Sequence, residues 1–287
     1  MSLAFRFLTF LSDYGLEDEF VGVCRGVIKR FAPEVEVLDI SHGIPPQDIS
    51  AGAAVLAQAV PYMPSAVHLA VVDPGVGTDR RAVALATEAG PLLVGPDNGL
   101  LWPAATVLGG LTEAFVIENE DLFLSGRSRT FHGRDIFAPV AARLALGMPL
   151  ADVGRAIPLD QVVVLETPMA RVDDDHIHSR VAQIDHFGNL QLNVHQFDLE
   201  GIGIMLGDAV EVRIGGRTFN ALYGQAFSDV AHGRLVLVED SHRWIGLAIN
   251  RGNARDTLEA RRGDAVIVAR VQVDATPAPP AWAPPVG

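Results

Sequence analysis

The sequence predicts an α/β domain followed by a smaller all-β domain. In the first part of the chain, short apolar runs alternate with segments of helical spacing. From about residue 168, period-2 stretches are separated by glycine and asparagine turns instead. The 287 residues are enough for two such domains, each with its own core. We therefore expect domains at 1–167 and 168–272, followed by an extended Pro-rich tail at 273–287.

The elements of the first domain follow from apolar spacing and turn residues. Phe20, Val23, Val27 and Phe31 recur at helical intervals, which predicts a helix that ends before Pro33. The alternation of such helices with short apolar runs is typical of a sheet with helices on its faces. We expect strands at 5–11, 35–40, 67–72, 82–87 and 91–94, and helices at 18–31, at 47–60 and, after a loop, within 130–147.

The second domain contains several short strand-like segments. A hairpin turn is indicated by "IGGR" within 210–223, and further strands are expected at 234–238, 244–250 and 265–271. This spacing is typical of a small barrel or a sandwich.

Composition excludes several classes of partner. The net charge of −13, from 35 acidic residues against 22 Lys and Arg, disfavours nucleic acid and anionic membranes. No apolar stretch approaches the roughly 20 residues of a membrane helix. The start "MSLAFRFLTF" is typical of a first strand rather than a signal peptide, and Cys24 is the single cysteine. We expect a cytoplasmic protein that acts on a small molecule.

Five polar loops combine glycine or proline turns with titratable or amide side chains. Four belong to the α/β half, where ligands collect beyond the carboxyl ends of strands. These loops are "SDYGLEDEF" (12–20), "DPGVGTDRR" (73–81), "GPDNGL" (95–100), "TFHGRD" (130–135) and "IDHFGNLQLN" (184–193).

Phosphate-loop and metal explanations find little support in the sequence. "GVGTDRR" lacks the Lys-Ser/Thr pair of a P-loop and the third glycine of a dinucleotide fingerprint. No cysteine pair or calcium loop is present, and no serine lies in a nucleophile elbow. We interpret "DDDHIH" (173–178) as a solvated connector and expect no metal site.

Together, the motifs "FLSDYGLEDEFVGVCRGVI", "ISHGIPPQDISAGA", "VVDPGVGT", "GPDNGLL", "TFHGRDIFAPVAA" and "IDHFGNLQLN" resemble those of the S-adenosylmethionine hydroxide adenosyltransferases. This family is the hydrolase branch of the fluorinase and chlorinase superfamily, and the resemblance spans Phe5 to Val268. It implies hydrolysis of S-adenosylmethionine to adenosine and methionine without a metal or separate cofactor. It also implies an N-terminal α/β domain with a central sheet flanked by helices, a C-terminal β-barrel, and a homotrimer with sites between subunits.

The resemblance implies a water-activating set of Asp73, Arg80 and His132. Water would attack C5′ of the ribose in line with a neutral thioether leaving group, so positioning and partial deprotonation of the water matter most. We expect the glycine turn to bring Arg80 towards Asp73 across a gap that holds one water. Arg81 is expected to be a surface residue.

The resemblance also assigns substrate contacts. Asp13 matches the carboxylate that holds the ribose diol, and Asp185, beside Asn189, matches the acid that receives the methionine ammonium. Phe187 and Phe227 match aromatic positions that stack on adenine, although barrel core is an alternative for both. The remaining candidates are Asp18 (alternatively a charge for the first helical turn), Asn98 (alternatively a turn residue), Ser241 for the methionine carboxylate, and Asn250 and Arg251 for the adenine edge.

Departures from the halogenating branch favour hydroxide as the nucleophile. Asp73 would place a negative charge against a halide anion, which is unfavourable, and Gln47 stands where those enzymes have Trp. His242 occupies a position that is Arg in the fluorinases, which leaves the contact with the methionine carboxylate open. The alternatives are an S-adenosylmethionine-dependent chlorinase and a non-catalytic protein that binds adenosine or S-adenosylmethionine.

Overall fold

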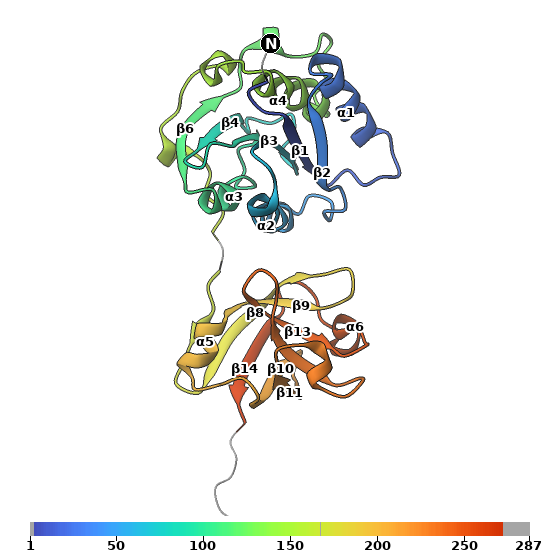
Figure 1. The fold of residues 1–287 in the computed structure, drawn as a ribbon, viewed down its shortest axis with the longest axis vertical. Coiled ribbons are helices and arrows are strands. Elements are labelled where there is room, and N and C mark those ends of the chain that lie inside the picture. Colours follow the sequence, from blue (N-terminus) through green and yellow to red (C-terminus); the bar gives the residue numbers. More distant parts are fainter. Residues whose placement is uncertain (1–2, 167, 272–287) are drawn as a thin grey trace, which may run out of the picture. The chain divides into compact units, whose positions relative to one another are not determined.

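The structure, a computed structural model, describes residues 3–166 and 168–271 and divides into two compact units, Met1–Glu166 and Thr167–Gly287 (Figure 1). This division lies beside the boundary expected from the sequence. The Pro-rich tail expected at 273–287 lies outside the described residues. Among the described residues, no helix has the length and apolar character needed to cross a membrane.

The first unit is built on a six-stranded sheet in the order β2-β1-β3-β5-β4-β6. β1 runs parallel to β2 and β3, and β3 runs parallel to β5, whereas β4 is antiparallel to β5 and β6. Ser12 at the end of β1 pairs with Val71 at the end of β3, so the loops that follow these two strands leave the sheet side by side. The strands are β1 (Phe7–Ser12), β2 (Glu36–Ser41), β3 (Ala66–Val71), β4 (Ala82–Thr87), β5 (Leu92–Pro96) and β6 (Leu111–Val116).

Helices cover both faces of this sheet, as the resemblance implies (Figure 1). α1 (Phe20–Phe31) and α4 (Ala138–Ala145) lie on one face, and α2 (Ile49–Ala59) and α3 (Trp102–Val107) lie on the other. The helix expected at 47–60 begins at Ile49 because the Asp48 side chain caps it, accepting a hydrogen bond from the Ala51 amide. β6 and the six-residue helix α3 were not predicted.

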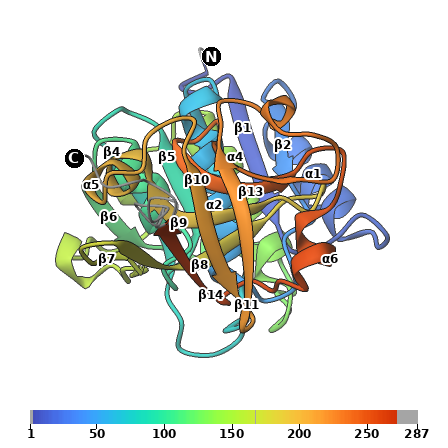
Figure 2. The same cartoon turned by 90° about the horizontal axis from the view of Figure 1, so that it is seen from below.

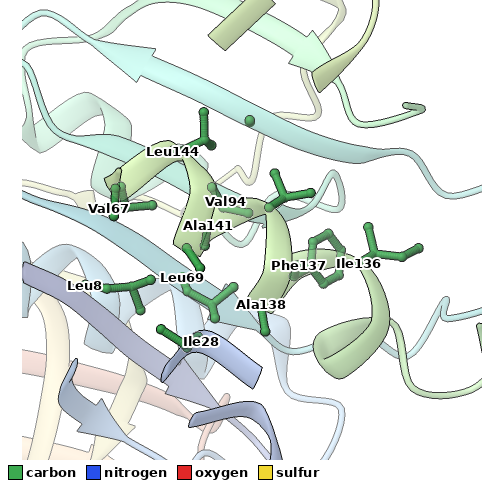
Figure 3. Packing of buried hydrophobic residues seen from close by; sticks show 14 of the residues in the cluster. Leu8, Ile28, Val67, Leu69, Val94, Ile136, Phe137, Ala138, Ala141 and Leu144 are labelled. Atoms are coloured by element: carbon green, nitrogen blue, oxygen red, sulfur yellow. The ribbon is translucent and has the colours of Figure 1, made fainter. Parts of the chain in front are cut away.

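α4 packs against the sheet and α1 through buried apolar side chains (Figure 3). Ala138, Ala141 and Leu144 pack on Leu8 of β1, on Val67 and Leu69 of β3, and on Ile28 of α1. The small alanine side chains let the helix axis approach the sheet closely. A π-helical turn (Gly133–Phe137) precedes α4. His132, the residue before this turn, is therefore held by a buried, well-packed element.

The second unit is a β-barrel, which confirms the prediction from the resemblance. Seven of the eight strands in its sheet form a closed ring, because β14 pairs with both β10 and β8. The eighth strand, β7, pairs with β8 on the edge opposite β14. The short helices α5 (Gln196–Gly201) and α6 (Ala254–Leu258) lie on opposite sides of the barrel (Figures 1 and 2). The strands are β7 (Arg171–Val172), β8 (His176–Ile184), β9 (Leu190–His195), β10 (Ala209–Ile214), β11 (Arg217–Tyr223), β12 (Leu235–Glu239), β13 (Trp244–Ile249) and β14 (Ala265–Arg270).

Two local predictions in this unit have different outcomes. The "IGGR" hairpin is confirmed, since Ile214 pairs with Arg217 and both intervening glycines have positive φ, as a two-residue turn requires. The interpretation of 173–178 as a connector is wrong for its second half, because His176 and His178 lie in β8. Short 3₁₀ turns complete the fold at Val60–Tyr62, Glu120–Leu122, Leu150–Val153, Leu159–Gln161 and Phe227–Asp229.

Candidate active site

The loop after β3 folds back on itself through two consecutive turns. The Val76 amide donates to the Asp73 carbonyl at 3.2 Å, and the Thr78 amide donates to the Gly75 carbonyl at 3.2 Å. Gly77 has φ +79°, and a Cβ at this position would lie 2.6 Å from the Arg129 carbonyl oxygen. Only glycine therefore allows the loop to turn here and pack against the segment that leads to His132.

The double turn places Arg80 directly on Asp73. Arg80 Nε donates to Asp73 Oδ1 at 3.0 Å, and Nη2 donates to Oδ2 at 2.5 Å. The two side chains are only 8% and 6% exposed, respectively. The expectation of a water-filled gap between them is wrong, because the planar guanidinium matches both carboxylate oxygens at once.

His132 joins this pair through the same guanidinium. Its Nδ1 lies 3.2 Å from Arg80 Nη2. A guanidinium can only donate, so Nδ1 must accept, and the neutral imidazole carries its proton on Nε2. Burial, reinforced by the Arg80 charge, lowers the pKa of His132 and favours this neutral form. The structure thus brings Asp73, Arg80 and His132 together, as the motifs predict.

Burial shifts the pKa of Asp73 upward, whereas it shifts that of His132 downward. It raises the pKa of this carboxyl, although the neighbouring Arg80 guanidinium lowers it, and the nearby Asp13 charge raises it further. The result is a carboxylate that is more basic than an ordinary aspartate yet still paired with a cation.

The loop after β1 brings Asp13 and Tyr14 to the same region. The backbone amide of Gln47, which has a φ of +66°, donates to Asp13 Oδ2 at 2.8 Å and so orients this carboxylate. Burial raises the pKa of Tyr14 well above its usual range, and the charges of Asp13, Asp73 and Arg80 act on the same hydroxyl. Sequence reasoning did not single out Tyr14, although it lies inside the quoted "SDYG" motif.

Tyr14 also explains the glycine in "FHGRD". A Cβ on Gly133 would lie 2.1 Å from the Tyr14 hydroxyl oxygen. The tyrosine ring packs edge-on against Phe20 and Phe131, with ring centroids 5.9 and 5.7 Å away. The hydroxyl therefore sits directly above the π-helical turn that follows His132.

Hydrogen bonds of Arg81 and Asn98 hold the two ends of the loop after β3 in place. Arg81 pairs with Asp97, whose side chain is almost completely buried, with Nε to Oδ2 at 2.8 Å. Arg81 is thus only partly exposed, and the expectation of a surface residue missed its ion pair with Asp97. Asn98 Nδ2 donates to the Val72 carbonyl at 2.9 Å, and Asn98 Oδ1 accepts from the Leu100 amide. This side chain fixes the residue before Asp73, and its contact with substrate stays a prediction.

In the second unit, Asp185 organises its own turn. Its Oδ1 accepts from the backbone amides of Phe187 and Asn189 at 2.9 and 2.8 Å, and its Oδ2 accepts from Asn189 Nδ2 at 2.8 Å. Gly188 has φ +84° and lies against Asn253, the N-cap of α6. Asp185 remains exposed, so lone pairs on its carboxylate are accessible to a cationic ligand.

The two aromatic candidates are exposed. Phe187 is 75% and Phe227 is 49% accessible, which rules out the alternative that they belong to the barrel core. Asn250 Nδ2 donates to the Val230 carbonyl at 2.7 Å, which ties the segment after Phe227 to the loop after β13. Arg251 continues that loop with a φ of +56°.

Ser241 lies elsewhere on the barrel. It belongs with His242 to the turn between β12 and β13, whereas Asn250 and Arg251 follow the other end of β13. Ser241 Oγ lies 3.3 Å from His242 Nδ1. A ligand that contacts Ser241 as well as Asn250 and Arg251 would have to extend along β13. Asp18 is exposed in the turn before α1.

Family models match both units. The N-terminal domain of the S-adenosylmethionine hydroxide adenosyltransferases matches residues 8–154, and the C-terminal domain matches residues 179–267. The chain belongs to this family. The ordered motifs and both folds are thus accounted for by one family over most of the chain.

The relatives of this chain carry two kinds of name. A protein of Salinispora arenicola named (R)-S-adenosyl-L-methionine hydrolase is 49% identical over 90% of this chain and 95% of its own length. A hydrolase of the same name from Thermus thermophilus is 38% identical over 88% and 96%. A fluorinase of an Actinoplanes species is more distant, at 30% identity over 85% and 90%.

A solved structure shows the same architecture. The crystal structure of an uncharacterised conserved protein from Thermotoga maritima is 38% identical, with a TM-score of 0.86 over 92% of this chain and all of its own. The adenosyltransferase fold described above is therefore shared with an experimental structure.

Proposed function

We propose that this protein hydrolyses S-adenosyl-L-methionine to adenosine and L-methionine by in-line attack of water on ribose C5′. The observation that carries the proposal is the Arg80 guanidinium, which contacts both Asp73 and His132 and is largely shielded from solvent. The names of the relatives at 49 and 50% identity support the same reaction.

The three side chains have separate roles in this mechanism. Arg80 stabilises hydroxide character on the attacking water. His132 is neutral, and its Nε2–H donates to the water because Nδ1 is occupied by Arg80. Asp73 is the proton acceptor, since burial raises its pKa and each of its oxygens keeps a further lone pair. Methionine leaves as a neutral thioether and needs no general acid.

The remaining candidates hold the substrate. Asp13 binds the two ribose hydroxyls, and its orientation by the Gln47 amide supports this role. Asp185 and Asn189 receive the methionine ammonium, and the exposed rings of Phe187 and Phe227 stack on adenine. Asn98, Asp18, Ser241, Asn250 and Arg251 complete the proposed binding set.

The proposal includes a homotrimer, a cytoplasmic location and no metal or cofactor in the reaction. Sites built between neighbouring subunits are tested by mixing a chain with Asp73→Asn and a chain with Asp185→Asn at substrate concentrations well below KM, where both variants are impaired. Activity of the mixture clearly above the mean of the two separate variants supports shared sites. A monomer in solution scattering would rule them out.

Product analysis separates hydrolysis from the two alternatives. The purified chain is incubated with S-adenosylmethionine in the presence and absence of chloride, and the nucleosides are separated by chromatography. Adenosine and methionine in equal amounts, unaffected by chloride, support the proposal. A chlorinated nucleoside would favour a chlorinase, and retained but unconverted substrate would favour a binding protein.

A further inference from the structure

Three side chains with metal-binding atoms converge in the hairpin of β7 and β8, outside the proposed active site. His176 Nε2 and His178 Nε2 lie 3.3 and 3.1 Å from Asp173 Oδ2, respectively, and 2.9 Å from each other. We propose that Asp173, His176 and His178 bind a divalent first-row transition-metal ion, with zinc as its representative.

The triangle of ligand atoms has the right size for such an ion. Zinc binds imidazole nitrogen and carboxylate oxygen at roughly 2.0–2.2 Å, so two ligands of a tetrahedral ion lie roughly 3.3–3.5 Å apart. The three observed separations, from 2.9 to 3.3 Å, approach one face of that tetrahedron. Small side-chain rotations open the triangle, and a fourth position remains for water because all three side chains are partly exposed.

The strand geometry creates this convergence. His176 and His178 are two residues apart in β8 and therefore point to the same face, while Ile177 between them is fully buried in the core. The Asp173 amide donates to the His176 carbonyl at 2.9 Å, which closes a turn with Asp174 and Asp175 between them and places Asp173 on that face. The ligands are thus held by a paired strand rather than by a free loop.

A second carboxylate fixes the orientation of one ligand. Asp175 Oδ1 lies 2.5 Å from His176 Nδ1 and, as a carboxylate, can only accept. The proton of neutral His176 is therefore on Nδ1, and its Nε2 presents a lone pair towards Asp173 and His178. A carboxylate that orients a ligating histidine through its other nitrogen is typical of metal sites.

The Arg171 guanidinium competes with a metal ion for the site. Arg171 Nη2 lies 3.1 Å from Asp173 Oδ2, but this pair is largely exposed and so contributes little. On the other side of β8, the strand β14 places Ile267 and Ala269 opposite the two histidines, and neither carries a charge. A divalent ion displaces the Arg171 side chain without breaking a buried contact.

The site lies at the opposite end of β8 from Asp185, about 25 Å away along the strand. Within the second unit, the metal therefore has no direct access to the proposed methionine contact. We assign it a stabilising role, in which the ion holds the turn that carries Asp173 against the two histidines of β8. This inference is independent of the proposed hydrolysis.

Calorimetric titration of the untagged, chelator-treated full chain with Zn²⁺ tests the site. The wild-type chain is expected to bind one ion and to unfold at a higher temperature in its presence. Asp173→Asn, His176→Asn and His178→Asn each remove a ligand and should weaken binding by more than about 100-fold, whereas Asp175→Asn keeps all three ligands and should weaken it by about 10–100-fold. Arg171→Gln should strengthen binding, because it removes the competing cation.

Matched controls come from the same chain. Asp174→Asn lies in the same turn, and His232→Asn removes an exposed histidine from a distant loop, so both should bind zinc as the wild type does. No saturable binding by the wild-type chain would overturn the proposal. Equal affinity in the wild type and all three ligand variants would overturn it as well, and circular dichroism establishes that each variant is folded.

Discussion

The Arg80 guanidinium and the Asp73 carboxylate meet through two hydrogen bonds, Nε to Oδ1 at 3.0 Å and Nη2 to Oδ2 at 2.5 Å. The same guanidinium donates to His132 Nδ1 at 3.2 Å. Arg80 is therefore the centre of the proposed catalytic set, and in the proposed reaction the attacking water lies beside the pair rather than between its members.

Arg80→Lys tests whether the fork geometry of Arg80 matters beyond its charge. Lysine cannot contact both Asp73 oxygens and His132 at once. We expect kcat to fall about 100-fold or more while KM changes little, because the lost interaction acts on the attacking water. The matched control is Arg81→Lys, which weakens the ion pair with Asp97 and should lower stability more than kcat. Equal loss of kcat in the two variants would contradict the assigned role.

Gly133→Ala tests the contact between Tyr14 and the π-helical turn. The new Cβ would lie 2.1 Å from the Tyr14 hydroxyl oxygen, so either the ring or the segment carrying His132 must move. Displacement of a catalytic group by about 1 Å costs about 100-fold in rate. Combining Gly133→Ala with Tyr14→Phe removes the closest atom and should restore part of kcat. Wild-type kcat in the single variant would show that this contact is unimportant.

Asp185→Asn tests the methionine contact. Asparagine keeps the two backbone hydrogen bonds at Oδ1 but loses the negative charge. Loss of a charged hydrogen bond should raise KM about tenfold with little effect on kcat. Asp174→Asn removes an equally exposed carboxylate of the same unit and should leave KM unchanged. A substrate analogue without the amino group should not distinguish Asp185→Asn from the wild type. If it does, the ammonium contact is wrongly assigned.

Two buried histidines make the first unit sensitive to acid. Burial lowers the pKa of His42 and of His68 to about 4, below the value of about 6.5 that an unfolded chain has. The unfolded state therefore binds more protons between these values. Stability is fully present above about pH 6.5 and falls towards pH 4 by about 1.4 kcal/mol per pH unit for each histidine. Urea unfolding at pH 7, 6 and 5 measures this slope. His68→Gln should reduce it, whereas His232→Gln, at an exposed position, should not.

The sequence predicted the layers of the fold because apolar periodicity and turn residues report local structure directly. The helix over 18–31 differs from α1 only at its start, and the "IGGR" turn is where it was expected. β6 was missed because the exposed Thr112 and Glu113 interrupt its apolar run, and α3 was missed because it is a single short helix with Pro103 in its first turn. Neither segment shows a periodic pattern that is long enough to recognise.

For the candidate site, local motifs predicted the residues, whereas the contacts between these residues depend on the fold. The motifs identified Asp73, Arg80 and His132, but only the folded chain shows that the pair is direct. The partner of Arg81 is Asp97, on another strand end, and no local signal links the two. The three aspartates before His176 suggest a solvated segment by composition, although pairing with β7 and β14 makes the histidines part of a strand.

In the proposed reaction, water attacks C5′ of S-adenosylmethionine in the site formed around Arg80. The most direct test is a single-turnover reaction in ¹⁸O-labelled water, followed by mass spectrometry of the adenosine and methionine. We expect one labelled oxygen in adenosine, at O5′, and none in methionine, with no turnover in Asp73→Asn. Unlabelled adenosine, or labelled adenosine formed equally well by that variant, would contradict it.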